Sequence, residues 1–449
     1  MERWVRCVVD AFEIPICSVI EYSLKRYIMK DFIRKIISNN LAINSSIVFA
    51  GSMVSNVGSY LYHLVVGRIL GPSGYGELSS LISLLYIFGV PTIVLQTVLV
   101  KYFSTCKASQ SPGQAAYLFK KMTKTLLLIL MPLFAVLCAC SPFIADFLNI
   151  SGSRVVIWVL LIFVISTLTA VNTSVLQGFQ LFIWYALLTA GGSIVKLVVS
   201  IPFAYQGVEM TMIASFLIVA IFYIVYFVPM RFIFAVSDKR MDLTKKDVMK
   251  YTIPTFFTLL GMTALYSIDI VLVKHYVSAI DAGIYSSVAV LGKVIFYASS
   301  AIGTVLFPVL AERHAKGKDT FSIVRLSVLL VAGLSLFVTI IYAAFPKEVV
   351  HLLFGPSFDE ASTYLGVFAV FITLYSIVNI LVLACLAIER MYVYIFTCIA
   401  SVLQILLIMF FHTSLLEVIY INIGITGLLC MSVGAYYWYG KNKYYHSGI

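Results

Sequence analysis

Twelve apolar stretches, each longer than 20 residues, run along this chain of 449 residues and constrain its fold more than any other feature. A helix of about 20 residues crosses the ~30 Å hydrocarbon core of a bilayer and satisfies its own backbone hydrogen bonds. Hydrophobic residues make up 61% of the chain and charged residues 11%, whereas a soluble domain has about 45–50% and about 25%. The sequence therefore predicts an all-α integral membrane protein with about twelve transmembrane helices.

The expected helices form two groups of six, separated by a polar stretch at residues 237–247. The first group covers residues 44–70, 77–102, 119–142, 153–177, 179–204 and 207–232, and the second covers 251–277, 283–310, 322–345, 362–388, 391–412 and 415–438. Because six is an even number, both groups enter the membrane in the same direction. We expect two parallel six-helix lobes around a central cavity, and the chain divides into an N-terminal lobe (44–235), a cytosolic linker (236–250), a C-terminal lobe (251–440) and a cytosolic tail (441–449).

The distribution of lysine and arginine gives these helices an orientation. With the N-terminus inside, 25 of the 31 basic residues fall in cytoplasmic segments and four fall in outer loops, namely Arg68, Arg154, Lys274 and Lys347. Short loops rich in basic residues are retained on the cytoplasmic side. We therefore expect both termini to be cytoplasmic in the plasma or inner membrane, with residues 1–43 forming an amphipathic or disordered cytosolic segment.

A weak internal repeat supports the parallel arrangement. A shift of 207 residues aligns the segment 67–80 with 274–287, which places Gly76 on Gly283 and the pair Ser79 and Ser80 on Ser286 and Ser287. Parallel repeats related by an axis along the membrane normal place the substrate site at their interface and alternate access by rocking against one another. We expect this architecture here.

The distribution of charge, the spacing of cysteines and the absence of catalytic motifs argue against several classes of function. The net charge of +11 resides in loops rather than on one face of a folded domain, so nucleic acid is not an expected partner. The eight cysteines show no CxxC spacing and most lie in apolar runs, which argues against a metal site or disulfides. There is no Walker A loop, HExxH or GxSxG motif. We expect no enzymatic activity and no cofactor.

Three segments resemble a known family. They are GRILGPSGYGELSSLISLLYIFGVPTIVLQTVLVKY (67–102), LQGFQ (176–180) and LLFGPSFDEASTYLGVFA (352–369). Over residues 44–440 the chain is similar to bacterial polysaccharide flippases of the multidrug/oligosaccharidyl-lipid/polysaccharide exporter superfamily. The resemblance implies a twelve-helix exporter that flips an undecaprenyl-diphosphate-linked oligosaccharide to the external leaflet for cell-surface polysaccharide biosynthesis. We expect a monomer whose partners are the lipid-linked oligosaccharide, membrane lipids, and the polysaccharide polymerase and glycosyltransferases of the same pathway.

Ionisable side chains inside spans are the first candidates for the site, because each costs about 2.5–3.5 kcal/mol on insertion scales. Lys196, Asp269 and Lys293 lie within expected helices. Our hypothesis is that Lys196 and Lys293, one from each half, line the cavity and attract the diphosphate, while Asp269 balances them when the site is empty. In the alternative, Asp269 pairs permanently with one lysine, or the lysines extend towards the interface.

Other polar side chains are secondary candidates. Arg68 ends the first span, where arginine commonly anchors at headgroup depth, and it is also a candidate contact for the substrate. His63 is either a helix contact or a group for proton coupling. The amides expected to meet sugar hydroxyls, or to form ordinary hydrogen bonds between helices, are Gln96, Asn172, Asn379 and Asn422.

Two other functions remain open from the sequence. A multidrug or organic-cation antiporter of the same superfamily would share the architecture, but its cavity should be acidic, and here two internal lysines oppose one carboxylate. A membrane-embedded oligosaccharide polymerase or ligase should have a large outer loop with catalytic arginines. The longest outer loop expected here, residues 346–361, is short and holds one lysine.

Overall fold

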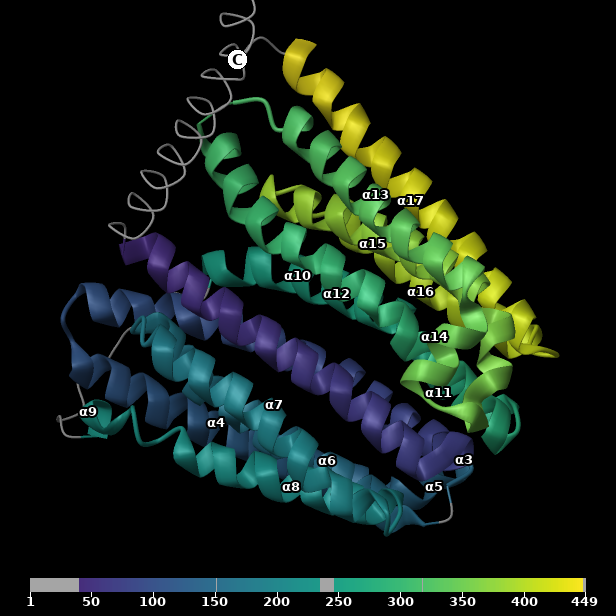
Figure 1. The fold of residues 1–449 in the computed structure, drawn as a ribbon. Helices are drawn as coiled ribbons and strands as arrows, with labels where there is room; N and C mark the ends of the chain where they lie inside the picture. Colours follow the sequence, from purple (N-terminus) through teal and green to yellow (C-terminus); the bar gives the residue numbers. More distant parts are fainter. Residues whose placement is uncertain (1–39, 151, 235–245, 317, 447–449) are drawn as a thin grey trace, which may run out of the picture.

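The computed structural model describes residues 40–150, 152–234, 246–316 and 318–446, and within these ranges all regular structure is helical (Figure 1). The first half contains α3 (Asn40–Ala108), α4 (Pro112–Ala139), α5 (Ser141–Phe147), α6 (Ser153–Gly178), α7 (Phe182–Ala204), α8 (Val208–Val225) and α9 (Arg231–Phe234). The second half contains α10 (Lys246–Leu265), α11 (Ile268–Tyr276), α12 (Ala279–Ala315), α13 (Phe321–Ala344), α14 (Pro346–Leu353), η1 (Pro356–Ala361), α15 (Ser362–Ala387), α16 (Val393–Phe410) and α17 (Leu415–His446).

The long element α3 consists of two passes joined by a sharp break. Gly71 has φ 67° and ψ 178°, a conformation that residues with a Cβ rarely adopt. Pro72 follows it, and a proline disfavours helical geometry in the residue before it. Residues 40–70 and 72–108 are therefore separate helices, as the sequence predicts for the first two spans.

The described residues contain ten helices long and apolar enough to span a membrane. The pair α10 and α11, bent by 41° where they meet, adds an eleventh span, and the break in α3 divides one long helix into two. The prediction of an all-α membrane protein with about twelve spans is confirmed.

Several boundaries differ from those expected. Helix α10 begins at Lys246, inside the expected linker, and α17 continues to His446, inside the expected tail. Helix α12 extends over residues 279–315 instead of 283–310, because polar residues near its ends continue the helix beyond the apolar core that hydropathy detects. The expectation for residues 1–43 lies outside the described residues, except that α3 begins at Asn40.

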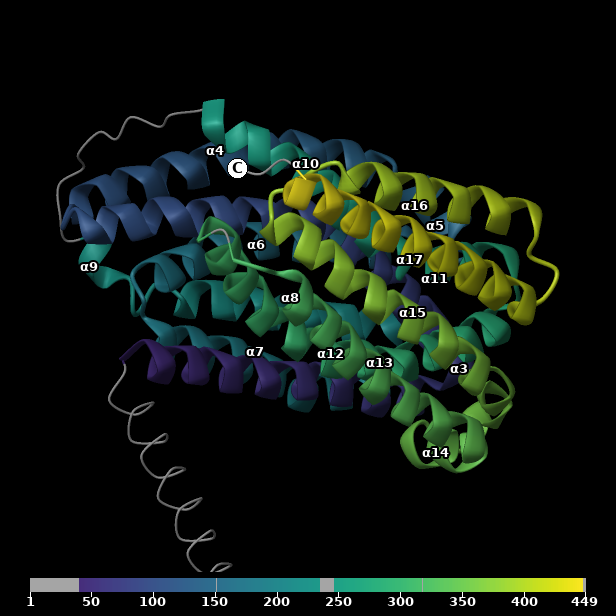
Figure 2. The same ribbon diagram turned by 90° about the horizontal axis from the view of Figure 1, so that it is seen from above.

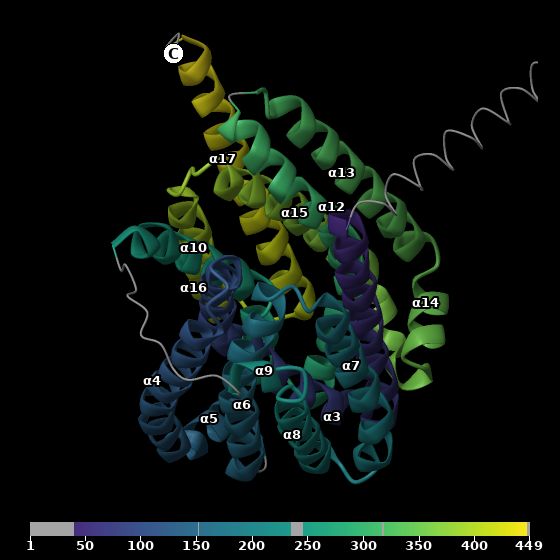
Figure 3. The same ribbon diagram turned by 90° about the vertical axis from the view of Figure 1, so that its left-hand side faces the viewer.

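The two halves repeat the same packing, as a parallel duplication requires. In the first half, α6 lies against the second pass of α3 and against α8, and α7 lies against the first pass of α3. In the second half, α15 lies against α12 and α17, and α16 lies against α10. Figure 2 shows that the long helices of both halves run along one common direction, and Figure 3 shows the halves grouped on opposite sides of the molecule.

The repeat-equivalent glycines meet at the interface between the halves. A Cβ added to Gly76 would lie 2.7 Å from the backbone nitrogen of Gly283, and one added to Gly283 would overlap the carbonyl of Pro72. Such backbone approach is possible only where both positions lack a side chain. The pseudo-twofold axis therefore passes between the second pass of α3 and α12.

The two halves lie close together at one end of the molecule, whereas at the other end α12, α13 and α17 lie away from the first half and α10 remains in contact with α3 (Figure 1). The break in α3 lies close to α11 and α14 at the end where the halves are close together. The start of α3 and the end of α17 lie at the other end. We call the first the seam end and the second the terminal end.

Substitution of Gly283 by alanine should separate the halves. The added methyl group meets backbone rather than a movable side chain, so we expect a loss of about 1–3 kcal/mol, the usual cost of overpacking, and a melting temperature several degrees lower in detergent. Gly89→Ala is the matched control, because nothing lies within 4 Å of its added Cβ and alanine favours the helix. Equal melting temperatures for the two variants would contradict the glycine contact.

Candidate functional site

Lys293, on α12, contacts two adjacent tyrosine rings that come from different halves. Its ammonium nitrogen is 5.1 Å from the ring centroid of Tyr86, on the second pass of α3, and 5.1 Å from that of Tyr266, at the break between α10 and α11. The side chain is 6% exposed. The centroids of the two rings are 6.1 Å apart, so the rings lie side by side on one flank of the ammonium group and also contact each other across the interface.

Lys196, on α7, has a similar environment within the first half. Its ammonium nitrogen lies 4.1 Å from the ring centroid of Tyr62, on the first pass of α3. Neither Lys196 nor Lys293 makes a hydrogen bond or an ion pair with any residue that the structure describes. Cation–π contacts contribute about 0.5–2 kcal/mol each, so both ammonium groups retain unused hydrogen-bonding capacity.

His63 connects the two lysine environments. Its Nδ1 lies 3.1 Å from the hydroxyl of Tyr75, its ring packs edge-on against Tyr62, and both Lys196 and Lys293 act on it electrostatically. The fold thus brings together three of the residues singled out in the sequence. We call Lys196, Lys293, His63, Tyr62, Tyr86 and Tyr266 the basic–aromatic cluster.

Asp269 lies at the start of α11 in a hydrogen-bonded network of its own. Its carboxylate accepts hydrogen bonds from the Tyr285 hydroxyl (2.6 Å), the Asn422 amide (3.2 Å) and the backbone N–H of Ile270 (2.9 Å). Asn422 in turn accepts a hydrogen bond from Gln404 at 2.8 Å. These contacts join α11, α12, α16 and α17 within the second half.

Asp269 does not form an ion pair with either lysine of the cluster. No described lysine lies within 4 Å of its carboxylate, so the permanent ion pair considered from the sequence is not formed. Lys293 still feels the charge of Asp269 at longer range. Asp269 is held by neutral donors, which leaves the lysines free of a direct counter-ion.

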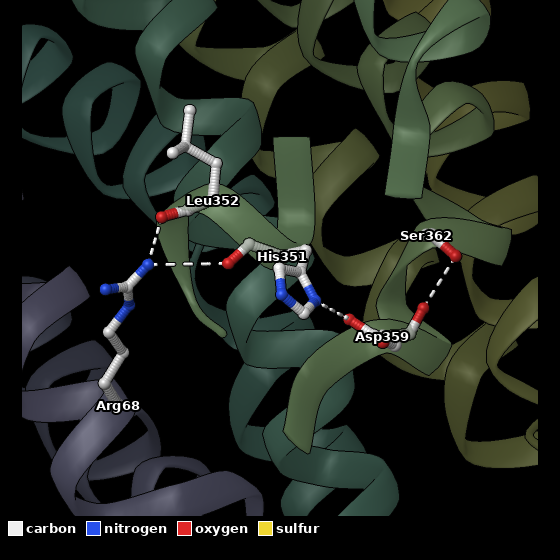
Figure 4. Close-up of polar contacts among 5 residues, drawn as sticks. All are labelled: Arg68, His351, Leu352, Asp359 and Ser362. Carbon is white, nitrogen blue, oxygen red and sulfur yellow. Dashed lines mark hydrogen bonds and ion pairs between the residues drawn. The ribbon is translucent and has the colours of Figure 1, made fainter. Parts of the chain in front are cut away.

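Arg68, at the end of the first pass of α3, reaches across to the last turn of α14 (Figure 4). Its guanidinium donates hydrogen bonds to the carbonyls of Leu353 (2.9 Å), Leu352 and His351 (3.4 Å). These carbonyls lie in the last turn of a helix, where a cation is favourable, although the His351 carbonyl also accepts a hydrogen bond from the N–H of Gly355 at 3.0 Å. In this structure Arg68 binds the opposite half of the protein at the seam end.

Further contacts close the seam end around Arg68. The Asn149 amide donates to the carbonyl of His275 (3.0 Å), and His275 Nδ1 lies 2.5 Å from the carbonyl of Phe147. The ring of Tyr75 packs against Phe354, with centroids 5.3 Å apart. Together with the glycine contact, these interactions hold the two halves against each other at the seam end.

The other amide residues singled out from the sequence make no hydrogen bond to the basic–aromatic cluster within the described residues. The Asn172 amide donates to the carbonyl of Tyr223 at 3.4 Å, and the backbone carbonyl of Gln96 accepts from Ser174. Asn379 is partly buried on α15, and no residue in the described ranges hydrogen-bonds to its amide. Their role in binding sugars stays a prediction.

One residue expected in an outer loop is buried instead. Lys274 lies within α11 and is 3% exposed, facing the charge of Glu77 from the other half. The expected span, residues 251–277, includes this lysine, but the count of basic residues assigned it to an outer loop because it lies near the end of that span. The expectation that Lys274 lies in a loop is therefore wrong.

The tyrosines of the cluster were not singled out from the sequence, although a signal exists. Tyrosine in a membrane protein is enriched at the interfaces, where its hydroxyl meets water. Tyr62, Tyr86 and Tyr266 lie inside spans, where an aromatic ring with a polar group needs a local reason. Their proximity to lysine supplies that reason.

Replacement of Arg68 should loosen α14. Hydrogen bonds to a charged donor contribute about 1.5–3 kcal/mol, so Arg68→Met should increase amide hydrogen exchange in residues 346–353 about tenfold or more. Arg68→Lys should recover only part of the protection, because lysine lacks the planar fork. Arg154→Met is the matched control, since Arg154 is exposed and makes no described contact. Unchanged exchange in Arg68→Met would show that the contact contributes nothing to the seam.

Solved transporter structures share this fold. An inward-facing multidrug resistance MATE family transporter of the MOP superfamily is 15% identical, with a TM-score of 0.67 over 86% of this chain and 95% of that chain. The lipid II flippase MurJ, in an inward closed conformation, is 13% identical, with a TM-score of 0.66 over 89% and 87%. An outward-facing MATE family transporter is 15% identical, with a TM-score of 0.60 over 90% and 96%.

Sequence comparison identifies the family. No curated protein matches the chain. The family model described as polysaccharide biosynthesis protein matches residues 133–363, slightly more than half of the chain. With about twelve spans in its described residues and the fold of the multidrug/oligosaccharidyl-lipid/polysaccharide exporter superfamily, the chain belongs to the polysaccharide biosynthesis protein family, as the resemblance in its sequence predicts.

Proposed function

We propose that this protein is a flippase that moves an undecaprenyl-diphosphate-linked oligosaccharide from the cytoplasmic to the external leaflet of the plasma membrane. The observation that carries the proposal is the pair Lys196 and Lys293, two ammonium groups in the membrane-spanning region without a direct counter-ion among the described residues. A diphosphate provides the missing negative charge and accepts charge-assisted hydrogen bonds.

The sign of this charge disfavours a cationic substrate. Among the described residues, the carboxylate that acts on Lys293 is that of Asp269, and its oxygens already accept hydrogen bonds from Tyr285 and Asn422. An organic cation entering the same region would meet the fields of two ammonium groups in a medium that screens charge poorly. A multidrug antiporter of the same fold therefore remains the second candidate.

Unpaired tyrosine hydroxyls support a carbohydrate substrate. The hydroxyls of Tyr60 and Tyr62 are buried, and within the part of the chain that the structure describes neither makes a hydrogen bond of 3.5 Å or less, although the Ser215 hydroxyl lies near that of Tyr62. Buried polar groups are normally paired, so such groups beside a site are available for a ligand. Tyrosine offers both a hydroxyl for hydrogen bonds and a ring face for the C–H groups of a sugar.

The arrangement of the halves supports loading from the cytoplasm. The seam end is closed by Arg68, Asn149 and the glycine contact, whereas α12, α13 and α17 lie away from the first half at the terminal end (Figure 1). The basic residues of the sequence favour cytoplasmic termini, which makes the terminal end the cytoplasmic one.

Liposomes containing the purified protein test the proposal. A fluorescent lipid-diphosphate oligosaccharide should become less accessible to an inner-leaflet reagent when wild-type protein is present. Lys196→Ala and Lys293→Ala should each slow flipping about tenfold or more, the effect expected when one charge-assisted contact is lost, while expression and folding are retained. Lys196→Arg and Lys293→Arg, which keep the charge, should retain most of the activity.

Two outcomes would overturn the proposal. One is wild-type flipping by the Lys196→Ala, Lys293→Ala double variant, which would leave both lysines with a structural role only. The other is no flipping by wild-type protein together with efficient efflux of an organic cation, which would assign the chain to the antiporter function.

A further inference from the structure

The contact between Tyr86 and Lys293 joins positions that the internal repeat makes equivalent. The 207-residue shift that aligns Gly76 with Gly283 also places Tyr86 on Lys293. Both pairs meet across the interface, one through backbone and the other through side chains. The Tyr86–Lys293 contact is therefore a second crossing of the pseudo-twofold axis, formed by a ring from one half and a cation from the other.

We propose that Tyr86 and Tyr266 form an aromatic cage that holds Lys293 while the site is empty, and that the diphosphate of the lipid substrate withdraws Lys293 from Tyr86, which couples substrate binding to separation of the two halves. The inference rests on the proposed flippase function and deepens it by naming the residue that links binding to movement.

The two rings of the cage have different roles. Tyr266 is fixed within its own half by Phe296 and Tyr375, whose ring centroids lie 5.9 and 5.6 Å from its own. Lys293 belongs to the same half, so its contact with Tyr266 persists when the halves move. Tyr86 is the ring from the opposite half. Loss of the Lys293–Tyr86 contact leaves Tyr86 with its ring contact to Tyr266, 6.1 Å between centroids, and therefore weakens the link between the halves at this position.

A phosphate group is chemically suited to compete with the cage. The ring faces attract Lys293 through their quadrupoles and accept no conventional hydrogen bond from its three N–H groups. Phosphate oxygens carry full negative charge and accept charge-assisted hydrogen bonds, which are stronger. Asp269 acts on Lys293 from within the second half, so it retains the ammonium group on that side and does not bridge the halves.

Lys196 provides an internal comparison. It has the same kind of contact, with Tyr62, but both residues belong to the first half. A diphosphate that withdraws Lys196 from Tyr62 breaks no contact between halves. Weakening of this contact should change affinity for the diphosphate without changing the separation of the halves.

The test alters the electron density of the ring without altering its shape. Tyr86→Phe removes the hydroxyl, which interacts with Tyr297, and is the reference of the series. Replacement of that ring by 4-fluorophenylalanine and then by 3,4,5-trifluorophenylalanine weakens cation–π attraction stepwise, because fluorine withdraws charge from the ring face. The same series at position 62 is the matched control. Farnesyl diphosphate is the probe, and the full-length protein in detergent is measured for its Kd and for amide hydrogen exchange of residues 346–353 at the seam end.

We expect the Kd for farnesyl diphosphate to fall about threefold to tenfold along the series at position 86, the range that corresponds to one cation–π contact. Exchange at 346–353 should rise along the same series without probe, and the additional increase caused by the probe should shrink. The series at position 62 should lower the Kd but leave exchange at 346–353 unchanged.

The outcomes separate the cage from the proposed function. If wild-type protein binds farnesyl diphosphate, Lys293→Ala weakens that binding, and the position 86 series changes neither Kd nor exchange, the cage is wrong and the flippase proposal stands. If wild-type protein does not bind farnesyl diphosphate, both the aromatic cage and the proposed flippase function are wrong. Inorganic diphosphate is the second probe, and equal affinity with an equal exchange response would overturn the assignment to a lipid-linked diphosphate.

Discussion

The close backbone contact between Gly76 and Gly283 is the constraint on which the interface depends. Because neither residue has a side chain, the second pass of α3 and α12 approach closely enough at the seam end for the Cβ of any other residue to overlap backbone. That approach brings Arg68 within hydrogen-bonding distance of the α14 carbonyls and Tyr86 within reach of Lys293. A wider separation of these two helices would remove the polar seam and the aromatic cage together, so the geometry of both follows from two missing side chains.

The membrane interior determines why lysine is paired with tyrosine here. An ammonium group in a span costs about 2.5–3.5 kcal/mol, and a direct carboxylate partner would neutralise it and leave little attraction for an anion. A cation–π contact with a tyrosine ring contributes about 0.5–2 kcal/mol and so offsets part of that cost. Because the ring is neutral, the positive charge of the lysine is preserved. The hydrogen bonds from Tyr285 and Asn422 to Asp269 act in the same direction, because they satisfy the carboxylate without placing it against Lys293.

The sequence predicts the architecture well and the site in part. Hydropathy and lysine distribution depend on the bilayer alone, so the spans and their parallel pairing could be read directly, and the weak repeat at Gly76 and Gly283 identified residues that do meet. The cost of buried charge pointed to Lys196, Lys293 and His63, which the fold brings together. The partners could not be read, because Tyr266 and Asn422 approach the site only through a break between helices and through contacts between distant spans. The capping of α14 by Arg68 depends on where a short helix ends, which apolar patterning does not reveal, and buried Lys274 looked like the edge of a loop.

The two halves place different residue types at positions that the internal repeat makes equivalent. The shift that places Tyr86 on Lys293 also places Tyr62 on Asp269, so at two equivalent positions the first half has a ring and the second has a charge. A symmetric pair of lysines at the axis would repel, and a symmetric pair of tyrosines would hold the halves together without any response to an anion. The mixed pair attracts through the ring face, yet leaves the ammonium hydrogens unused. An interface between similar halves can therefore be both closed in the absence of substrate and sensitive to a negatively charged one, which neither symmetric solution allows.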